Sequence, residues 1–310
     1  GDLFRGLAEL LAAIRAEALP DGYAVIGDPI AHTLSPRIHG AVFNALGIAE
    51  KYSAIHVPKG KLDIFVKKIP GSGLKGFNVT IPNKKDILRH LDDIGEDARL
   101  CGAVNTVVVE DGRLLGRNTD IEGLSESLRE SGRGCRRRKV VITGSGGAAG
   151  STAFMAAREG ASKITILARN LKEAEKLAAG LKALFPGVLV HAEKMEAAAM
   201  SEAACDADVL LNATPLGMEG SKENFRSFDF LKKLPAGALV YDLVYKPVRT
   251  ELLRKAAEIG LAVQNGLGML IYQGILADQI FLGRELDRPA LYSAVKEEIK
   301  DDHRIKTGRD

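Results

Sequence analysis

The stretch VVITGSGGAAGSTAFMAA, residues 140–157, constrains the fold more than any other part of the sequence. A β-branched run leads into a glycine-rich turn, and a pattern typical of a helix follows. Gly144, Gly146 and Ala149 fit the spacing G-x-G-x-x-G/A, whose glycines let a backbone approach a pyrophosphate at a helix N-terminus. The order strand, turn, helix predicts a dinucleotide-binding unit of the Rossmann type. The candidate cofactor contacts in this turn are Gly144, Ser145, Gly146, Gly147, Ala148 and Ala149.

From residue 139 onward, short apolar runs alternate with helical patterns. The runs at 139–143, 163–168, 188–192, 209–213, 238–243 and 261–264 are predicted strands. Helical patterns lie between most of them, for example at 171–184 and 251–259. Buried strands that alternate with helices indicate a parallel sheet covered on both faces.

The part before residue 139 has an α/β pattern of its own. It predicts strands at 23–26, 52–57 and 77–80, and helices at 36–46, 61–68, 84–91 and 122–130. Asp111-Gly112 is a hairpin turn signal between the runs 104–110 and 113–116. After residue 266 the pattern is helical, at 269–281 and 291–300. These last helices have no sheet of their own and must pack on an existing domain.

The end of the second strand of a dinucleotide unit contacts the ribose, and NAD sites usually carry Asp or Glu there. Here the strand ends in Ala168-Arg169, and Lys172 follows one turn later. A cationic pair would attract a 2′-phosphate and leave no carboxylate for a bare ribose. The sequence therefore predicts NADP(H) as cofactor, with Arg169 and Lys172 as contacts.

Composition excludes several other classes of protein. A net charge of +3, with one short basic run at 136–139, gives no reason to expect a nucleic-acid partner. No apolar run reaches the ~18 residues of a membrane span. Cys101, Cys135 and Cys205 are scattered without a C-x-x-C pair, which favours reduced thiols in the cytoplasm and no metal site. Charged residues interrupt 1–19, where we expect an amphipathic helix and no signal-peptide core.

Four stretches before residue 121 are more polar than a scaffold requires: AHTLSPRIH (31–39), GFNVTIPNKK (76–85), GAVNT (102–106) and GRNTD (116–120). Each lies where a predicted strand ends or a helix begins, and strand–helix proteins place ligand groups at such positions. The stretches supply hydroxyls, amides, a lysine and an aspartate without a metal-ligand cluster. This set suits a small polyhydroxylated anion.

Three further stretches, NATPLGM (212–218), YDLVYKP (241–247) and NGLGMLIYQG (265–274), complete a resemblance to the shikimate dehydrogenase family over about residues 22–285. The resemblance implies reversible NADP-linked reduction of 3-dehydroshikimate to shikimate, in the biosynthesis of chorismate and the aromatic amino acids. It also implies two domains, with C-terminal helices that return to the first. We expect an N-terminal helical extension (1–19), a substrate-binding catalytic domain (20–121 and 266–310) and an NADP-binding Rossmann domain (122–265).

The family's functional positions carry over individually. Lys84 and Asp120 match the catalytic pair, and Tyr245 matches a tyrosine that reaches the substrate carboxylate from the cofactor side. Thr33 and Ser35 match the paired hydroxyls that hold the carboxylate, although many members have serine at the first position. The positions that bind ring hydroxyls or shape their pocket are Asn78, Thr80, Asn105 and Gln273. The positions that would line the nicotinamide are Thr214, Gly217, Met218 and Gly266, and Leu243 is a further expected cofactor contact.

Several alternatives stay open at this point. Ser35 could cap a helix, and Asp120 could cap a helix that begins at Ile121. Lys84 would lie at a helix start, where the helix dipole disfavours a cation, and this cost indicates a functional role rather than a surface position. His32 and His39 match no catalytic position and are expected to be structural or peripheral. A quinate or dual-specificity enzyme, or a catalytically silent relative, would share most of these residues, and Ala168-Arg169-Asn170 in place of the family's Asn-Arg-Thr could relax NADP preference. The sequence leaves a monomer or a homodimer equally open.

Overall fold

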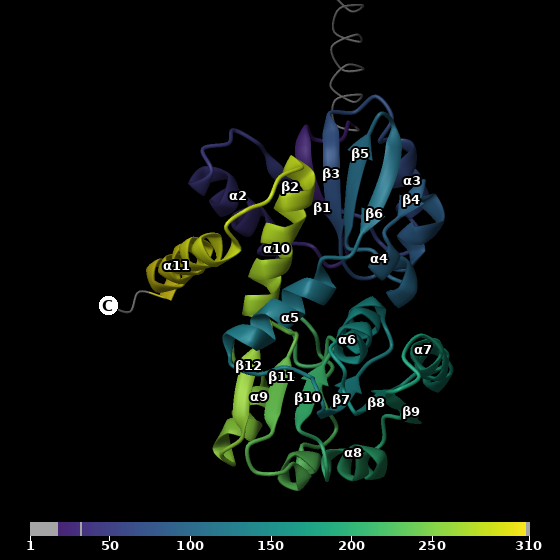
Figure 1. The fold of residues 1–310 in the computed structure, drawn as a ribbon. Helices are drawn as coiled ribbons and strands as arrows, with labels where there is room; N and C mark the ends of the chain where they lie inside the picture. The colour runs from purple at the N-terminus through teal and green to yellow at the C-terminus, as the bar shows by residue number, and fades with distance from the viewer. Residues whose placement is uncertain (1–17, 32, 308–310) are drawn as a thin grey trace, which may run out of the picture.

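The structure is a computed structural model that describes residues 18–31 and 33–307. It consists of two α/β lobes, each built on a six-stranded sheet, and so confirms the predicted fold class (Figure 1). The predicted N-terminal helix and His32 lie outside the described residues. No helix within the described ranges is long and apolar enough to cross a membrane.

The sheet of the first lobe is mixed. Strand β1 pairs in parallel with β2 and β3, whereas β5 pairs antiparallel with β3 and β6. Asp111 and Gly112 form the predicted two-residue turn between β5 and β6, with φ of 50° and 77°. In spatial order the strands are β2 (Tyr52–His56), β1 (Gly22–Gly27), β3 (Leu74–Val79), β5 (Thr106–Glu110), β6 (Arg113–Arg117) and β4 (Asp93–Ile94).

The helices after residue 266 complete this first lobe, as the sequence predicted. Ile38 and Val42 form one buried cluster with Ile271, Ile275 and Val295, so the last two helices share a core with a helix near the start of the lobe. Figure 1 shows α10 (Leu267–Leu282) running alongside the first sheet. The helices of this lobe are α2 (Ser35–Ala45), α3 (Leu62–Lys67), α4 (Glu96–Cys101), α10 (Leu267–Leu282) and α11 (Arg288–Thr307).

The predicted helix at 84–91 is wrong. The segment forms only a short 3₁₀ turn, η1 (Asp86–His90), in which Ile87 is the one buried residue. A segment without an apolar stripe has too little to bury to sustain an α-helix. Lys84 therefore lies in the loop after β3, so the expected conflict with a helix dipole does not arise. Strand β4 and helix α4 were not predicted from the sequence.

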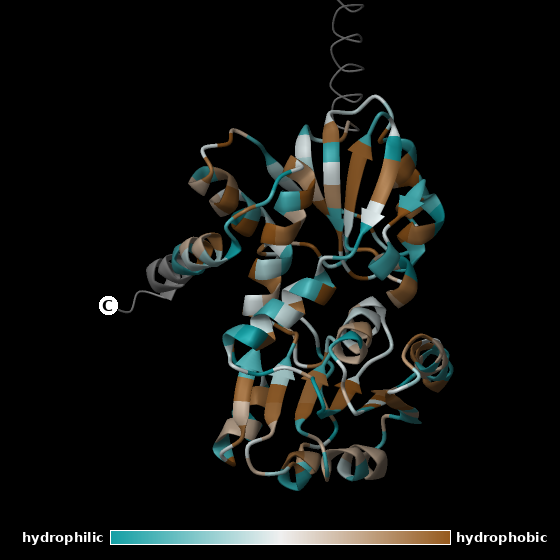
Figure 2. Ribbon diagram, viewed as in Figure 1, coloured by the Kyte–Doolittle hydropathy of each residue, from teal (hydrophilic) through white to brown (hydrophobic). Residues whose placement is uncertain are grey.

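The sheet of the second lobe is entirely parallel, and helices cover both its faces. Helices α5, α6 and α7 share one buried cluster with the sheet, while α8, α9 and the 3₁₀ turn η2 share the other. Figure 2 shows how strongly hydrophobic residues concentrate in these strands. In spatial order the strands are β12 (Ala262–Asn265), β11 (Leu239–Asp242), β10 (Val209–Asn212), β7 (Lys139–Thr143), β8 (Lys163–Ala168) and β9 (Leu189–Lys194). The helical elements are α5 (Asp120–Glu130), α6 (Gly147–Arg158), α7 (Leu171–Leu184), α8 (Ala197–Ala204), η2 (Asp229–Lys233) and α9 (Glu251–Glu258).

Helices α5 and α10 pack closely where the lobes meet (Figure 1). A Cβ atom on Gly123 would lie 2.8 Å from the backbone nitrogen of Gln273, so glycine is required for this approach. The predicted domain boundary at residues 121/122 falls inside α5, and the one at 265/266 falls between β12 and α10.

Asp242 is a buried carboxyl group at the end of β11. It accepts hydrogen bonds from the Asn212 amide, the Val244 backbone N–H and the Thr250 hydroxyl. Burial nevertheless raises its pKa from 3.8 to about 6. Because the folded protein then holds this proton more tightly than the unfolded chain, ionisation of Asp242 lowers stability as pH rises through this interval.

We expect Asp242→Asn to remove this pH dependence. Between about pH 4 and pH 6, the free energy of unfolding of the wild type should fall relative to that of the variant by up to about 3 kcal/mol. Urea unfolding at several pH values measures the difference. Asp206→Asn is the control. Lysine contacts lower the pKa of that carboxyl, so its titration changes the free energy of unfolding only below this pH interval. Parallel wild-type and Asp242→Asn curves would contradict the prediction.

Candidate active site

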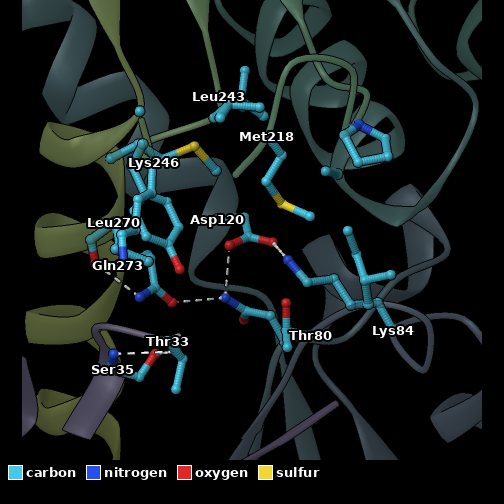
Figure 3. A pocket seen from close by; sticks show the side chains of 18 of the residues that line it. Thr33, Ser35, Thr80, Lys84, Asp120, Met218, Leu243, Lys246, Leu270 and Gln273 are labelled. Atoms are coloured by element: carbon cyan, nitrogen blue, oxygen red, sulfur yellow. Dashed lines mark hydrogen bonds and ion pairs between the residues drawn. The ribbon is translucent and has the colours of Figure 1, made fainter. Parts of the chain in front are cut away.

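A cavity of about 240 Å³ lies between the two lobes, at the carboxyl ends of β3 and β10. Both lobes contribute side chains, and Figure 3 shows many of them pointing into the same space. All nine residues predicted to bind substrate or assist catalysis line it: Thr33, Ser35, Asn78, Thr80, Lys84, Asn105, Asp120, Tyr245 and Gln273. Of the predicted cofactor contacts, Ala148, Thr214, Met218, Leu243 and Gly266 line it as well.

Lys84 and Asp120 form an ion pair in this cavity, with 2.6 Å between Nζ and Oδ2 (Figure 3). Their side chains are 14% and 4% exposed, so solvent screens the pair weakly. Asp120 does not cap α5, because the side-chain oxygen of Asn118 accepts the N–H groups of Asp120 and Ile121. The capping alternative is therefore wrong, and both oxygens of the carboxylate are available to the cavity and its neighbours.

Asn105 connects this ion pair to the rest of the site. Its side-chain nitrogen lies 2.9 Å from Asp120 Oδ1 and 3.2 Å from Gln273 Oε1 (Figure 3). Its side-chain oxygen accepts the backbone N–H of Thr119 at 2.7 Å. The carboxylate of Asp120 thus has one oxygen on Lys84 and the other on Asn105, which fixes the direction in which the carboxylate faces.

Three hydroxyl groups of the cavity lining gather away from Lys84. They belong to Thr33, Ser35 and Tyr245, which we call the hydroxyl cluster. Thr33 Oγ1 and Ser35 Oγ are 3.2 Å apart. Helix α2 begins at Ser35 with Leu34 at the N-cap, so the helix-capping alternative for Ser35 is wrong. Burial raises the pKa of Tyr245 and outweighs the contact with Thr33, which lowers it. The phenol therefore stays protonated at neutral pH. The cluster therefore presents hydrogen-bond donors, as an anion requires.

The glycine turn lies at the end of β7, beside β10, where the strand order of the sheet reverses; ligands of open α/β sheets bind at such a point. Gly144 has a φ of +112°, and a Cβ there would lie 3.0 Å from the carbonyl oxygen of Ala213. Gly146 is the N-cap of α6, and a Cβ there would meet nothing within 4 Å. Unfilled space in front of a helix N-terminus fits a dinucleotide phosphate. Of the predicted contacts at 144–149, only Ala148 lines the cavity, and Gly147 and Ala149 belong to the first turn of α6.

Arg169 and Lys172 lie outside the cavity, after β8 and in the first turn of α7. Arg169 forms an exposed ion pair with Glu223, 2.7 Å between nitrogen and oxygen. Gly217 also lies outside the cavity; it has a φ of +77°, and its N–H donates to the carbonyl oxygen of Glu223. Gly217 thus helps to hold the loop that brings Glu223 to Arg169.

Several residues around the site were not predicted from the sequence. Lys85 reaches across the cleft, where its Nζ lies 3.1 Å from the carbonyl oxygen of Ser145 and 3.2 Å from Glu173. Glu223 and Tyr52 were also missed, and neither lies in a motif that could have identified it. Within the part of the chain that the structure describes, no group of acidic, histidine and cysteine side chains could hold a metal ion.

Comparison with known proteins agrees with this geometry. A family profile described as "Shikimate dehydrogenase substrate binding domain" matches residues 25–107. The shikimate dehydrogenase (NADP(+)) of Symbiobacterium thermophilum is 40% identical over 260 residues, which cover 84% of this chain and 88% of the relative. The chain belongs to the shikimate dehydrogenase family. The resemblance stated from the sequence is confirmed.

Solved structures of the family share the two-lobed fold. The shikimate 5-dehydrogenase of Thermus thermophilus, in complex with NADP(H) and shikimate, is 32% identical with a TM-score of 0.75, over 90% of this chain and all of that one. The fold also carries a different reductase. The 5-ketofructose reductase of a Gluconobacter species is 30% identical with a TM-score of 0.73, over 90% of this chain and 99% of that one.

Proposed function

We propose that this protein is a shikimate dehydrogenase, which reversibly reduces 3-dehydroshikimate to shikimate with NADPH. The observation that carries the proposal is the ion pair of Lys84 and Asp120, which faces the hydroxyl cluster across a cavity beside a dinucleotide turn. Such a cavity offers a proton donor at one end and anion-binding hydroxyls at the other. The 40% identity to a shikimate dehydrogenase (NADP(+)) supports this choice of substrate and cofactor.

Lys84 and Asp120 handle the proton in the proposed reaction. Reduction of a ketone leaves an alkoxide, which is too basic to persist in a cavity without a proton donor. The Lys84 ammonium would stabilise the developing negative charge and donate the proton, while Asp120 would orient the ammonium and accept a bond from a neighbouring hydroxyl. The 2.6 Å contact would hold the ammonium in this orientation.

The substrate would lie between the ion pair and the hydroxyl cluster. The donors of Thr33, Ser35 and Tyr245 suit a carboxylate, and the amides of Asn78, Asn105 and Gln273, with the Thr80 hydroxyl, suit ring hydroxyls. These contacts would fix which ring carbon faces the second lobe. Orientation of this kind makes a large contribution to the rate of an enzymatic reaction.

The second lobe would hold NADP(H), which supplies or accepts the hydride when bound. The amide groups at the N-terminus of α6 would bind the pyrophosphate, and Arg169 with Lys172 would bind the 2′-phosphate. Thr214, Gly217, Met218, Leu243 and Gly266 would surround the nicotinamide. Met218, Leu243 and Gly266 line the cavity together with Lys84, which supports a hydride path next to the ion pair.

We also propose that the enzyme works in the cytoplasm, as a monomer or a homodimer. Cys101, Cys135 and Cys205 are all free thiols, and the first two are buried, which suits a reducing compartment.

The proposed function predicts the result of a comparison of substrates and cofactors. Shikimate with NADP should give the highest kcat/KM among shikimate or quinate with NADP or NAD, because Arg169 favours the 2′-phosphate. Absorbance of the reduced nicotinamide measures all four rates, and reduction of 5-ketofructose with NADPH is a fifth arm. Absence of turnover with shikimate would refute the proposal. Faster turnover of quinate or 5-ketofructose than of shikimate would show that this other compound is the preferred substrate.

Loss of the Lys84 ammonium should abolish most of the chemistry. We expect Lys84→Ala to lower kcat by roughly 10²–10⁴-fold while shikimate binds within a modest factor, because the proton donor acts mainly in the transition state. Asp120→Asn should act in the same direction, and the double variant should lose less than the two effects combined. Lys75→Ala is a matched control, because that ammonium pairs with Glu50 at an exposed position and does not line the cavity. Near-normal turnover of Lys84→Ala would show that the mechanism is wrong.

Arg169 should set the preference for NADP. Arg169→Asp is expected to weaken NADP by roughly ten- to a hundredfold more than NAD, since it removes a charge-assisted contact to the 2′-phosphate. Glu223→Gln is the control: it breaks the same ion pair but keeps the guanidinium, so the preference for NADP should survive. KM values for both cofactors measure the effect. An unchanged ratio in Arg169→Asp would exclude this residue as the phosphate contact.

A further inference from the structure

Four polar side chains form a column from the core of the first lobe to the cavity, in the order Asp278, His39, Tyr52 and Asn78. His39 Nδ1 lies 2.6 Å from Asp278 Oδ1, and both side chains are fully buried. The His39 ring stacks on the Tyr52 ring, with 3.9 Å between centroids and 5° between planes. The Tyr52 hydroxyl lies 2.6 Å from Asn78 Oδ1, and Asn78 lines the cavity.

The contacts of Asn78 determine which way its amide faces. Its nitrogen donates to the carbonyl oxygen of Asn105 at 3.1 Å and contacts Thr106 Oγ1 at 3.0 Å. A carbonyl oxygen only accepts, so the nitrogen must face Asn105 and the oxygen must face Tyr52. Tyr52 therefore donates its hydroxyl hydrogen to Asn78. Both amide hydrogens of Asn78 are then engaged, and the remaining lone pair of its oxygen is the group it can offer to a ligand.

Tyr52 is held as a donor in one position. Burial, together with the charge of Asp278, keeps the pKa of Tyr52 well above its usual value, so the phenol stays protonated. The stack on His39 fixes the ring, and the bond to Asp278 fixes His39.

The buried pair of His39 and Asp278 lowers the stability of the core. His39 Nε2 and Asp278 Oδ2 are buried without hydrogen-bond partners among the described residues. Unmet buried polar atoms reduce stability, and apolar side chains of similar size commonly fill such positions without this loss. A role in positioning Tyr52 accounts for the pair better than a role in stability does.

We infer that Tyr52 is a positioning residue for the substrate: it orients Asn78 as a hydrogen-bond acceptor for a hydroxyl group of the ring. The inference rests on the proposed function and goes beyond it. It predicts that the cavity selects a ligand with a hydroxyl donor at this position and disfavours a carbonyl there, which would face the amide oxygen.

The test is a double-mutant cycle in which Tyr52→Phe and Asn78→Ala are made singly and together. Tyr52→Phe should raise KM for shikimate about three- to tenfold, with kcat within about twofold and KM for NADP unchanged, because one hydrogen bond to a binding group loses its support. In the Asn78→Ala background the same change should alter KM less than about twofold, since Tyr52 then has nothing to position.

Tyr23→Phe is the matched control. Tyr23 stands opposite Tyr52 in the β1–β2 register, and its hydroxyl donates to the carbonyl oxygen of Phe281 at 3.3 Å, away from Asn78. It should leave KM for shikimate unchanged even where it lowers the melting temperature. Calorimetric titration with shikimate at low temperature gives the same comparison for any variant of reduced stability.

The outcomes separate this inference from the proposed function. A wild-type enzyme that neither binds nor oxidises shikimate would overturn the proposed function and this inference with it. An active wild type with an unchanged KM in Tyr52→Phe would overturn the inference alone. The inference alone would also be overturned if Tyr52→Phe raised KM equally in the wild-type and Asn78→Ala backgrounds. A rise of the same size in Tyr23→Phe would overturn it too.

Discussion

The arrangement of the active site depends on one buried amide, the side chain of Asn105. Through it, the segment that precedes β5 is bonded to Asp120 at the start of α5 and to Gln273 in α10. The backbone oxygen of the same residue accepts the Asn78 amide from β3. A buried donor or acceptor left without its partner costs about 1–3 kcal/mol, so these four segments cannot shift independently. The position of the Lys84–Asp120 pair is thereby set by the core of the first lobe.

The separation of the first lobe into two stretches of chain follows from the same geometry. Gln273 can meet Asn105 only if the chain returns from the second lobe, and α10 makes that return beside α5. Two glycines allow the approach: Gly123 against Gln273, and Gly266, where a Cβ would lie 2.0 Å from the Leu243 carbonyl oxygen. The cavity is consequently bounded by residues from both ends of the chain and from the inserted sheet.

Sequence patterns predicted the second lobe well, because fully buried strands and amphipathic helices are local features. The helix at 171–184 has the predicted bounds. Local patterns failed where distant contacts decide the structure. The segment after Lys84 has a single buried residue and forms a 3₁₀ turn in place of an α-helix, and Asn118 takes the capping role considered for Asp120. Glu223 and Tyr52 find their partners 54 and 26 residues away, so no spacing rule could have identified them.

The ion pair in the cavity and the ion pair at Arg169 differ in how far solvent reaches them. Lys84–Asp120 is nearly buried, so its geometry is fixed and its attraction is little screened. Arg169–Glu223 has side chains 65% and 57% exposed, and such a pair contributes only about 0–1 kcal/mol. Under the proposed function, a 2′-phosphate can displace Glu223 at little cost, since its two charges outweigh a single solvated carboxylate. Under this proposal, the nearly buried pair lies where a proton would move along a fixed path, and the exposed pair lies where a ligand would enter and leave.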